Sequence, residues 1–535
     1  MKMFLKKKIQ KATSVIMVIM MTVALAIPVS LATAPMTAEA EACCEVTLYG
    51  GQTLQFDSFV KGWAFACYKA YTYDYEKSTT LKLLSNWDSW TKSGSLKYNG
   101  HKYKYSKYDM GFDISRRDVG NLDDSKDKID CFDDGHLYVP EDTIITIDLN
   151  GYNLNRQRWN NQDDDGEVIR LGKNAKLTIM DSRPDVKKSI EDHTCYGGVI
   201  MGGSSEDNGG GIRLERKAKL IVKGCNICCN QTSDHGGAIY VDHNDCQVYL
   251  YNTYIFCNKT RDSGDNCNGA GVYLNGGKLV MDGVTFETNS SEDYGGAIYS
   301  DEDGGVISAA NCKFIDNYCR DDGGAIYMNN GALELTNCTF YKNGAGDEGG
   351  AIYMNTSDGT LVDTCTFTYN YCDDRGGAMY ADGENMYFAD CTLTDNYAKN
   401  SGGAIFVEKS EKFNIQGLMQ IYNNKNKSKR ADNLFIEKGA TLYSGGLSDG
   451  SRVGISTNKT AECLIDITQW ELEHCFFTDV GYFSVSKWRS NGNESVLASV
   501  FSGGNLIVIC GVLFVFVAAM SYGIVKKKAT KREAA

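Results

Sequence analysis

The middle of the chain alternates between apolar and polar residues with a period of two. In residues 331–340 (Gly-Ala-Leu-Glu-Leu-Thr-Asn-Cys-Thr-Phe), Leu333 and Leu335 share one face of an extended chain, while Glu334 and Thr336 share the other. This alternation is typical of a strand with one buried face. No repeat in this region carries an apolar stripe with the 3.6-residue period of a helix. The pattern therefore predicts short, half-buried strands.

These strands belong to a repeat of about 27 residues. Its first element resembles Gly-Gly-Ala-Ile-Tyr, and its copies begin at Gly209 (a degenerate copy), Gly236, Gly269, Gly295, Gly323, Gly349, Gly376 and Gly402. Successive copies are 27, 33, 26, 28, 26, 27 and 26 residues apart. Its second element, apolar-x-x-Asn, ends at Asn230, Asn258, Asn289, Asn317, Asn343, Asn370, Asn396 and Asn424.

The length of the repeat restricts the fold. About 26 residues are too few for a strand–helix–strand unit, and the leucine signature of leucine-rich repeats is absent. Each repeat therefore predicts one coil of short strands, which stacks on the next coil at ~4.8 Å to form a parallel β-helix. The asparagines are then expected to form a file at one turn, because Asn tolerates a left-handed backbone and its amides hydrogen-bond along a stack.

The tandem Gly-Gly-Ala-Ile and Phe-x-x-Asn elements over 209–424 resemble those of the chlamydial polymorphic outer membrane proteins, which are surface adhesins. More broadly, they are similar to right-handed β-helices of the pectate-lyase type. The resemblance implies an all-β, right-handed parallel β-helix, which similar flanking stretches extend to 138–460. The chlamydial proteins end in an outer-membrane barrel, whereas this chain ends in an apolar run and lysines. Autotransport is therefore not implied, and a single-membrane envelope is expected.

The segments on either side of the repeats are predicted to cap the solenoid. Residues 43–137 do not repeat and are expected to form a small α/β cap. Their helix follows Asp57 and Ser58, and its apolar positions share one face: Val60, Trp63, Ala64, Cys67, Tyr68 and Tyr71. Residues 461–503 are expected to form a C-terminal cap and juxtamembrane region. Open solenoid edges need such covers.

The two ends of the chain predict secretion and anchoring. Residues 1–42 have the basic start, the apolar run and the Ala-Glu-Ala stretch of a signal peptide. Residues 504–525 are expected to form one transmembrane helix, because Leu506–Val525 carries no charge and basic residues follow at 526–535. The sequence thus predicts a single-pass protein of a bacterial cell surface, with its bulk outside and a short cytoplasmic tail. Its 20 cysteines suit an oxidising compartment.

Composition narrows the class of function. The chain has 55 basic and 68 acidic residues, a net charge of -13. Without the two basic ends (1–42 and 526–535), 45 basic and 65 acidic residues leave a charge near -20. Such a surface repels nucleic acid. A hydrophobic content of 42% excludes global disorder.

The tyrosine of the first element predicts an aromatic column. If the isoleucine points inward, alternation places the tyrosine outward in each coil. The column comprises Tyr240, Tyr273, Tyr299, Tyr327, Tyr353, Tyr380 and Phe406. Its rings are expected to bind sugar rings or a partner protein. The alternative is that stacked tyrosines only favour the strand and stabilise their neighbours.

Acidic residues gather before the glycine pairs. The candidate ligands of a metal ion are Asp293, Asp322, Glu348 and Asp374. Like charges about 5 Å apart repel, and Ca²⁺ is the cation that carboxylates prefer. No cofactor is required, since a solvated acidic edge screened by salt is the alternative.

Two groups of cysteines have a place in the repeat. Cys225, Cys312, Cys338, Cys365 and Cys391 occupy one position and are expected to form a buried column. Cys229 and Cys257 precede the Asn in successive coils. They are the predicted disulfide, because ~4.8 Å between Cα atoms is within the range of such a bond.

The sequence favours a binding protein over an enzyme. It contains no compact catalytic motif, and no catalytic residue is assigned. The regular repeat favours an adhesin or binding scaffold for polysaccharide or for a host or other cell surface. The expected partners are the lipid bilayer, through the C-terminal helix, and a polysaccharide or surface protein. A polysaccharide lyase or glycoside hydrolase of the pectate-lyase-like type is the alternative, because such β-helices host both chemistries.

Overall fold

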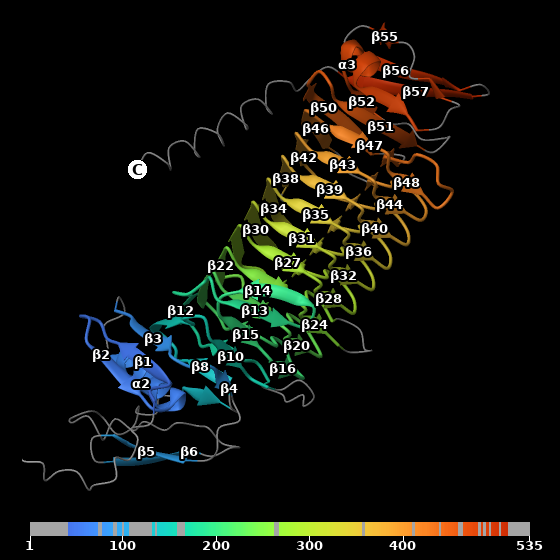
Figure 1. Ribbon diagram of the computed structural model, residues 1–535. Coiled ribbons are helices and arrows are strands. Elements are labelled where there is room, and N and C mark those ends of the chain that lie inside the picture. The colour runs from blue at the N-terminus through green and yellow to red at the C-terminus, as the bar shows by residue number, and fades with distance from the viewer. Residues whose placement is uncertain are drawn as a thin grey trace, which may run out of the picture. The chain divides into compact units, whose positions relative to one another are not determined.

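A stack of coils forms most of the computed structural model, and it confirms the predicted parallel β-helix (Figure 1). The structure describes residues 41–511, apart from 73–76, 89–93, 99–100, 106–130, 134–135, 158–165, 262–266, 356–358, 409–411, 438–439, 458–463, 480–482, 485–487, 492–493 and 502–503. The predicted signal peptide and the cytoplasmic tail lie outside the described residues.

Each coil contributes one strand to a long-strand sheet. Its described strands, in spatial order, are β2 (Thr53–Phe56), β1 (Cys44–Thr47), β3 (Thr79–Leu83), β9 (Ile144–Asp148), β12 (Lys176–Met180), β18 (Lys219–Lys223), β22 (Gln247–Tyr251), β26 (Lys278–Asp282), β30 (Gly305–Ala310), β34 (Gly331–Thr336), β38 (Thr360–Asp363), β42 (Met386–Ala389), β46 (Phe413–Gly417), β50 (Thr441–Leu447) and β52 (Leu464–Asp466). From β3 onward the neighbours pair in parallel, as stacked coils require.

Two ladders make up a second sheet, which has 25 described strands. The first ladder holds the Gly-Gly-Ala-Ile elements: β8 (His136–Val139, paired with β7, Phe132–Asp133), β11 (Ile169–Leu171), β17 (Ile212–Leu214), β21 (Ile239–Val241), β25 (Val272–Leu274), β29 (Ile298–Ser300), β33 (Ile326–Met328), β37 (Ile352–Met354), β41 (Met379–Ala381), β45 (Ile405–Val407) and β49 (Leu434–Ile436). The second holds the apolar-x-x-Asn elements: β4 (Trp87–Asp88), β10 (Asn153–Asn155), β15 (Val199–Met201), β19 (Asn226–Cys228), β23 (Tyr254–Phe256), β27 (Thr285–Glu287), β31 (Lys313–Ile315), β35 (Thr339–Tyr341), β39 (Thr366–Thr368), β43 (Thr392–Thr394), β47 (Gln420–Tyr422), β51 (Arg452–Thr457) and β53 (Phe476–Thr478).

A short-strand sheet closes each coil after the asparagine. Its described strands are β16 (Ser204–Ser205), β20 (Gln231–Thr232), β24 (Lys259–Thr260), β28 (Ser290–Ser291), β32 (Tyr318–Cys319), β36 (Gly344–Ala345), β40 (Tyr371–Cys372), β44 (Tyr397–Ala398) and β48 (Lys425–Asn426). The first glycine of the next pair then turns the chain, with φ between +63° and +73° from Gly236 to Gly402. Only glycine adopts this conformation without strain.

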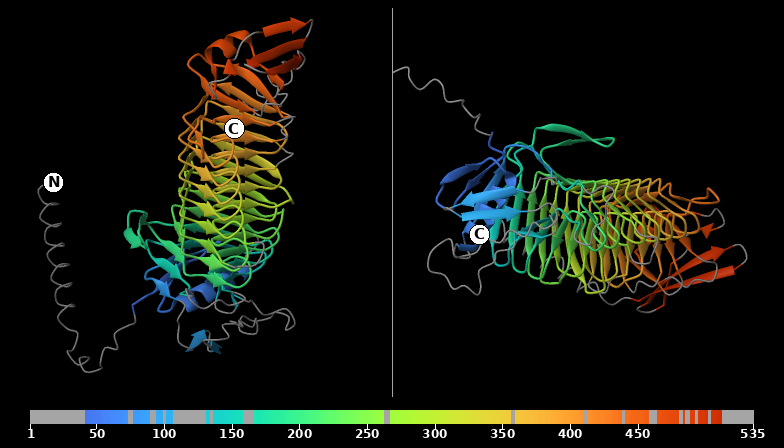
Figure 2. Two further views of the ribbon diagram at one scale, coloured as in Figure 1. Left: turned by 90° about the vertical axis from the view of Figure 1, so that its right-hand side faces the viewer. Right: turned by 90° about the horizontal axis from the view of Figure 1, so that it is seen from below.

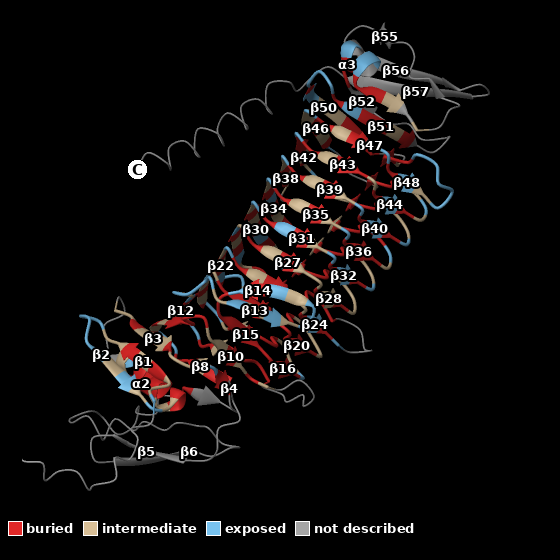
Figure 3. Cartoon of the chain, in the orientation of Figure 1, coloured by how far each residue is buried: buried red, intermediate tan, exposed pale blue. Residues whose placement is uncertain are grey.

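The core fills the inside of the coils (Figure 3). Alternation places Leu333 and Leu335 of β34 inward, at 2% and 0% exposure. Identical residues align in successive coils, and the rings of Phe314, Phe340 and Phe367 stack with centroids 4.6 Å apart. The predicted cysteine column is also buried. Register between neighbouring coils therefore decides which side chains meet.

The predicted asparagine file is present and fully buried. Asn343 Oδ1 accepts from both the backbone N and the Nδ2 of Asn317, at 3.1 and 3.0 Å, and Asn343 Nδ2 donates to the Phe314 carbonyl. The expected left-handed backbone falls instead on the preceding residue, such as Lys342 with φ 58°. The reason is that the amide must point inward to bridge the coils, so the residue before it makes the bend.

The N-terminal end of the solenoid carries the predicted helix. Helix α2 (Phe59–Thr72) packs against β1, β3 and β9. Trp63 is fully buried, and its Nε1 donates to the Cys131 carbonyl at 2.7 Å. The strands β5 (Gly94–Tyr98) and β6 (His101–Tyr105) form a separate hairpin. The exact domain limits stay a prediction.

The C-terminal end differs in part from the prediction. Helix α3 (Gln469–His474) begins with a capping box formed by Thr468 and Glu471. A four-stranded sheet follows, with β54 (Phe483–Ser484), β55 (Trp488–Asn491), β56 (Glu494–Phe501) and β57 (Gly504–Gly511). The first eight residues of the expected transmembrane helix are thus a strand that pairs with β56, and residues 512–525 lie outside the described residues. Within the described residues, no helix has the length and apolar character that crossing a membrane requires.

One hairpin leaves the regular path of the coils. Strands β13 (Lys187–Ile190) and β14 (His193–Tyr196) are inserted between β12 and β15. They stand outside the coil stack, as both views of Figure 2 show. The repeat count did not reveal this insertion, because it precedes the first glycine pair.

Candidate binding surface

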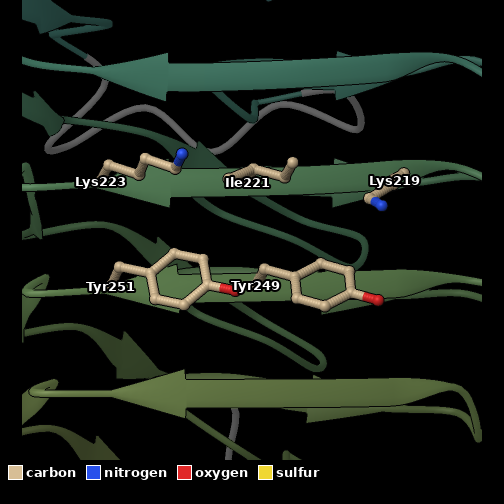
Figure 4. A pocket seen from close by; sticks show the side chains of 5 residues that line it. All are labelled: Lys219, Ile221, Lys223, Tyr249 and Tyr251. Atoms are coloured by element: carbon tan, nitrogen blue, oxygen red, sulfur yellow. The ribbon is translucent and has the colours of Figure 1, made fainter. Parts of the chain in front are cut away.

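Lysine and tyrosine side chains gather on the outer face of the long-strand sheet. Strand β18 turns Leu220 and Val222 inward, so Lys219, Ile221 and Lys223 point outward. The next strand, β22, presents Tyr249 and Tyr251 in the same register. These five side chains line a shallow, open depression of about 350 Å³ (Figure 4). We call it the Lys–Tyr surface.

The neighbouring strands extend this surface. Parallel register places Lys176 of β12 beside Lys219, and Lys278 of β26 lies one strand beyond Gln247. Lysines from three strands thus share one face of a protein whose net charge is -13. Asp282 at the end of β26 contributes one opposite charge. The face is a local basic area on an acidic molecule, and it favours an anionic ligand.

The lysines and tyrosines also contact one another. Lys219 Nζ lies 4.6 Å from the centroid of the Tyr249 ring, and Lys223 Nζ lies 5.9 Å from that of Tyr251. The Tyr249 hydroxyl donates to or accepts from its neighbour Gln247 at 3.1 Å. Cation–π contact holds the ammonium groups beside the rings. Apolar ring surface and positive charge therefore lie within reach of one ligand.

The predicted aromatic column is a continuous stack. Neighbouring rings from Tyr240 to Phe406 are 4.7–5.5 Å apart and within 17° of parallel, and Phe435 continues the file. Most members are buried, with Tyr380 and Phe406 at 2% exposure, while Tyr327 and Tyr353 are half-buried. The rings cover one another's faces, so only their edges remain for a ligand. A binding role for this column stays a prediction.

The hydroxyl groups of the column are also engaged. Tyr273 donates to Asp301 Oδ2 at 2.6 Å, and Tyr380 donates to Glu408. Burial raises the pKa of both phenols above its usual range, and the neighbouring carboxylates raise it further. The stack therefore contributes neutral, hydrogen-bonded side chains to the stability of the corner.

The four acidic residues predicted to bind calcium contact protein groups. Asp293 accepts from the Cys267 backbone N at 2.6 Å, and Asp322 accepts from the Glu348 backbone N at 2.8 Å. Glu348 pairs with Arg375, and Asp374 accepts from Asn400. In the part of the chain that the structure describes, no three His, Cys, Asp or Glu side chains come together as ligands of a metal ion. Calcium binding stays a prediction.

Two of these carboxyl groups have perturbed acidity. Burial raises the pKa of Asp322 and of Glu348 to about 7, against the lowering effect of Arg375. The Arg375 guanidinium lies over the rings of Tyr380 and Phe406, at 5.2 and 4.8 Å. Two carboxyl groups in neighbouring coils can thus hold protons near neutral pH.

Sequence reasoning missed both the Lys–Tyr surface and a second set of exposed tyrosines. Tyr318, Tyr371 and Tyr397 are 37–42% exposed on the short-strand sheet, because the small residues after them point inward. Tyr371 also covers Gly344, where a Cβ would meet its ring at 2.2 Å. The available signals were the outward positions of Lys-Leu-Ile-Val-Lys (219–223) and the Asn-Tyr pairs.

The predicted disulfide pair is brought together. The Cys229 and Cys257 thiols contact each other, and each raises or lowers the pKa of the other. No disulfide joins any two of the cysteines that the structure describes. The Cys229–Cys257 bond therefore stays a prediction.

Comparison with known proteins supports the fold. The family described as the right handed beta helix region matches residues 265–465, the C-terminal half of the coil stack. No curated protein and no solved structure matches the chain significantly. The molecule is thus an all-β, right-handed parallel β-helix, and the narrower likeness to the chlamydial repeats bears only on the proposal below.

Proposed function

We propose that this protein is a cell-surface binding scaffold, of the adhesin type, that holds an acidic polysaccharide on its Lys–Tyr surface. The observation that carries the proposal is the set of lysines from β12, β18 and β26 beside Tyr249 and Tyr251 on an otherwise acidic protein. The narrower resemblance to chlamydial surface adhesins favours the same class of function.

The chemistry of the surface suits a polymer of charged sugars. Tyrosine rings offer flat apolar area to the face of a pyranose, while ammonium groups pair with carboxylate or sulfate. The depression is open and shallow, as expected for a surface that follows an extended chain. Such binding weakens as salt rises, because exposed charges are screened.

Anchoring belongs to the same proposal. The basic and apolar start at residues 1–42 supports export, and the uncharged run Leu506–Val525 with its following lysines supports retention in the membrane. The bilayer is the partner of this segment. Fractionation of cells that express the full chain is expected to place it in the membrane, with the coils accessible to added protease.

The binding proposal is tested with the purified full chain and three polymers: polygalacturonate, dextran sulfate and neutral dextran. We expect both anionic polymers to bind and neutral dextran to bind at least tenfold more weakly. Lys223→Gln and Tyr249→Ala are each expected to weaken binding about three- to tenfold. Lys313→Gln and Tyr318→Ala, on other outer faces, serve as matched controls. Unchanged affinity in the first two variants contradicts the proposal.

A glycoside hydrolase or polysaccharide lyase is the second candidate. The observation in its favour is the pair Asp322 and Glu348, whose pKa values of about 7 suit a general acid. The assay measures release of reducing ends or of unsaturated products from polygalacturonate. Turnover that Glu348→Gln abolishes, with binding retained, favours the enzyme over the scaffold.

A further inference from the structure

The hairpin β13–β14 encloses a small core outside the coils. Its members are Cys195 and Ile190 of the hairpin and Val199, Met201, Cys228, Cys229, Tyr254, Phe256 and Cys257 of the solenoid, separate from the interior core. Among the described residues, β13 and β14 pair only with each other. An isolated two-stranded hairpin is marginally stable, so its side-chain contacts must hold it in place.

His193 anchors the tip of the hairpin. Its Nδ1 lies 3.5 Å from Cys257 Sγ, its Nε2 lies 3.2 Å from Thr288 Oγ1, and its ring lies 5.1 Å from that of Phe256. The hairpin thus reaches across three coils, from β15 to β27. Because these contacts are lateral, no backbone ladder fixes the hairpin on this face.

Cys195 faces the coils at the centre of this contact. It is 1% exposed, whereas its neighbours Thr194 and Tyr196 point to solvent. Cys228 projects outward from β19 between Met201 and Phe256 of the adjacent strands, and it is fully buried by the hairpin. The thiols of Cys195 and Cys228 are near enough to interact electrostatically. A hairpin thiol therefore meets a coil thiol across the interface.

We propose that Cys195 and Cys228 form a disulfide when the protein reaches an oxidising compartment, and that this bond fastens the hairpin to the solenoid. The pairing leaves Cys229 and Cys257 to each other, as the sequence predicts. Each bond forms when two thiols lose two protons and two electrons and an S–S bond joins their sulfurs. The oxidant is the disulfide of a dithiol–disulfide oxidoreductase, which is reduced to two thiols.

The surroundings of the thiols suit this chemistry. The ammonium group of Lys188, which lies opposite Cys195 in the hairpin, lowers the pKa of both thiols, while burial raises it. Lys188 thereby supplies charge that favours the attacking thiolate. Cys229 and Cys257 share one turn position with left-handed φ of 54° and 53°, so their Cα atoms are one coil apart.

The test is a disulfide map of the secreted full chain, trapped with an alkylating reagent and digested without reduction. We expect Cys195 linked to Cys228, with fragmentation separating Cys228 from Cys229. Alkylated Cys195, or a Cys195–Cys257 bond, overturns the proposal. This map of the natural chain decides the pairing even where a variant fails to fold.

Variants and exchange then test the fastening role. Cys228→Ser is expected to free Cys195 for alkylation and to leave Cys229–Cys257 intact. Cys246→Ser, at a buried cysteine elsewhere, is the control and is expected to change no pairing. Reduction is expected to speed amide hydrogen exchange in residues 187–196 at least tenfold, while the interior strands stay protected. Unchanged exchange in the hairpin overturns the fastening role.

Discussion

At the scale of single residues, the asparagine file shows how one side chain connects neighbouring coils. Asn343 is fully buried and serves four groups: the backbone N and Nδ2 of Asn317, the Phe314 carbonyl and Asn370 Oδ1. The file continues from Asn230 to Asn424 and ends on Asn433. Each amide satisfies donors and acceptors that would otherwise be buried without partners.

Asn343→Ala is expected to lower the free energy of unfolding by about 2–4 kcal/mol. The change removes the amide and leaves the Asn317 donors and the Phe314 carbonyl unsatisfied. The measurement is denaturant unfolding followed by circular dichroism. The exposed Asn355→Ala in the next coil is the control, with an expected change below about 0.5 kcal/mol. Equal effects of the two variants would contradict a special role for the file.

The acidic corner predicts a pH dependence. Burial raises the pKa of Asp322 to about 7, from an unfolded value near 3.8. The folded state therefore holds an extra proton between about pH 4 and pH 7, and this group lowers stability as pH rises through that window. Asp322→Asn keeps the Oδ1 acceptor and removes the charge, so it is expected to stabilise the protein at pH 8 by about 1–2 kcal/mol and to have no effect at pH 4.

Parallel unfolding curves of wild type and Asp322→Asn at the two pH values measure this difference. Asp373→Asn, at the exposed edge of the neighbouring corner, is the matched control and is expected to behave like wild type at both. A variant that gains the same stability at pH 4 as at pH 8 would show that charge burial is not the cause.

At the scale of elements, the helix at the N-terminal end protects an edge that strands alone leave open. Helix α2 lies against β1, β3 and β9, and Trp63 buries its whole ring there. The sheet β1–β2–β3 is antiparallel at this end and becomes parallel only at the β3–β9 pair. The change of direction ends the ladder, and the helix covers the first coil.

Trp63→Ala is expected to destabilise the N-terminal coils by about 3–5 kcal/mol, through lost packing and the lost hydrogen bond to Cys131. Hydrogen exchange should quicken in β3 and β9 and remain slow in β34 and β38, because each coil contacts only its neighbours. Tyr71→Ala, on the exposed end of the same helix, is the control. Uniform loss of protection along the solenoid would argue against local capping.

At the scale of the whole solenoid, stability is close to a sum over coils and their interfaces. Identical positions pair from coil to coil, as in Phe314, Phe340 and Phe367, and most steps between glycine pairs are 26–28 residues. Repeat architectures of this kind tolerate changes in the number of units better than changes in register.

Removal of one complete coil tests this additivity. Deletion of residues 323–348 joins Asp322 to Gly349 and keeps every file in register, so the shortened protein is expected to fold with a modest loss of stability. Deletion of 323–335, half a coil, shifts the pattern and is expected to give insoluble protein. Circular dichroism and gel filtration check both. Failure of the whole-coil deletion alone would mean that this coil has a specific role.

The sequence by itself determined the coil. Alternation of Leu333 and Glu334, the spacing of the glycine pairs and the recurring asparagines specify strand, corner and turn, and each coil finds its partners about 27 residues away. Contacts so regular in sequence are visible as a period. For this reason the fold, the asparagine file and the interior cysteines followed from the pattern alone.

Only the tertiary structure decided which outward residues reach solvent. Tyr380 and Tyr249 both point outward from strands, yet the first is buried by rings above and below it and the second lines an open depression. The hairpin likewise brings His193 to Cys257, 64 residues away and outside the repeat. Exposure depends on side-chain packing between coils and on irregular insertions, and neither has a period that a single chain displays.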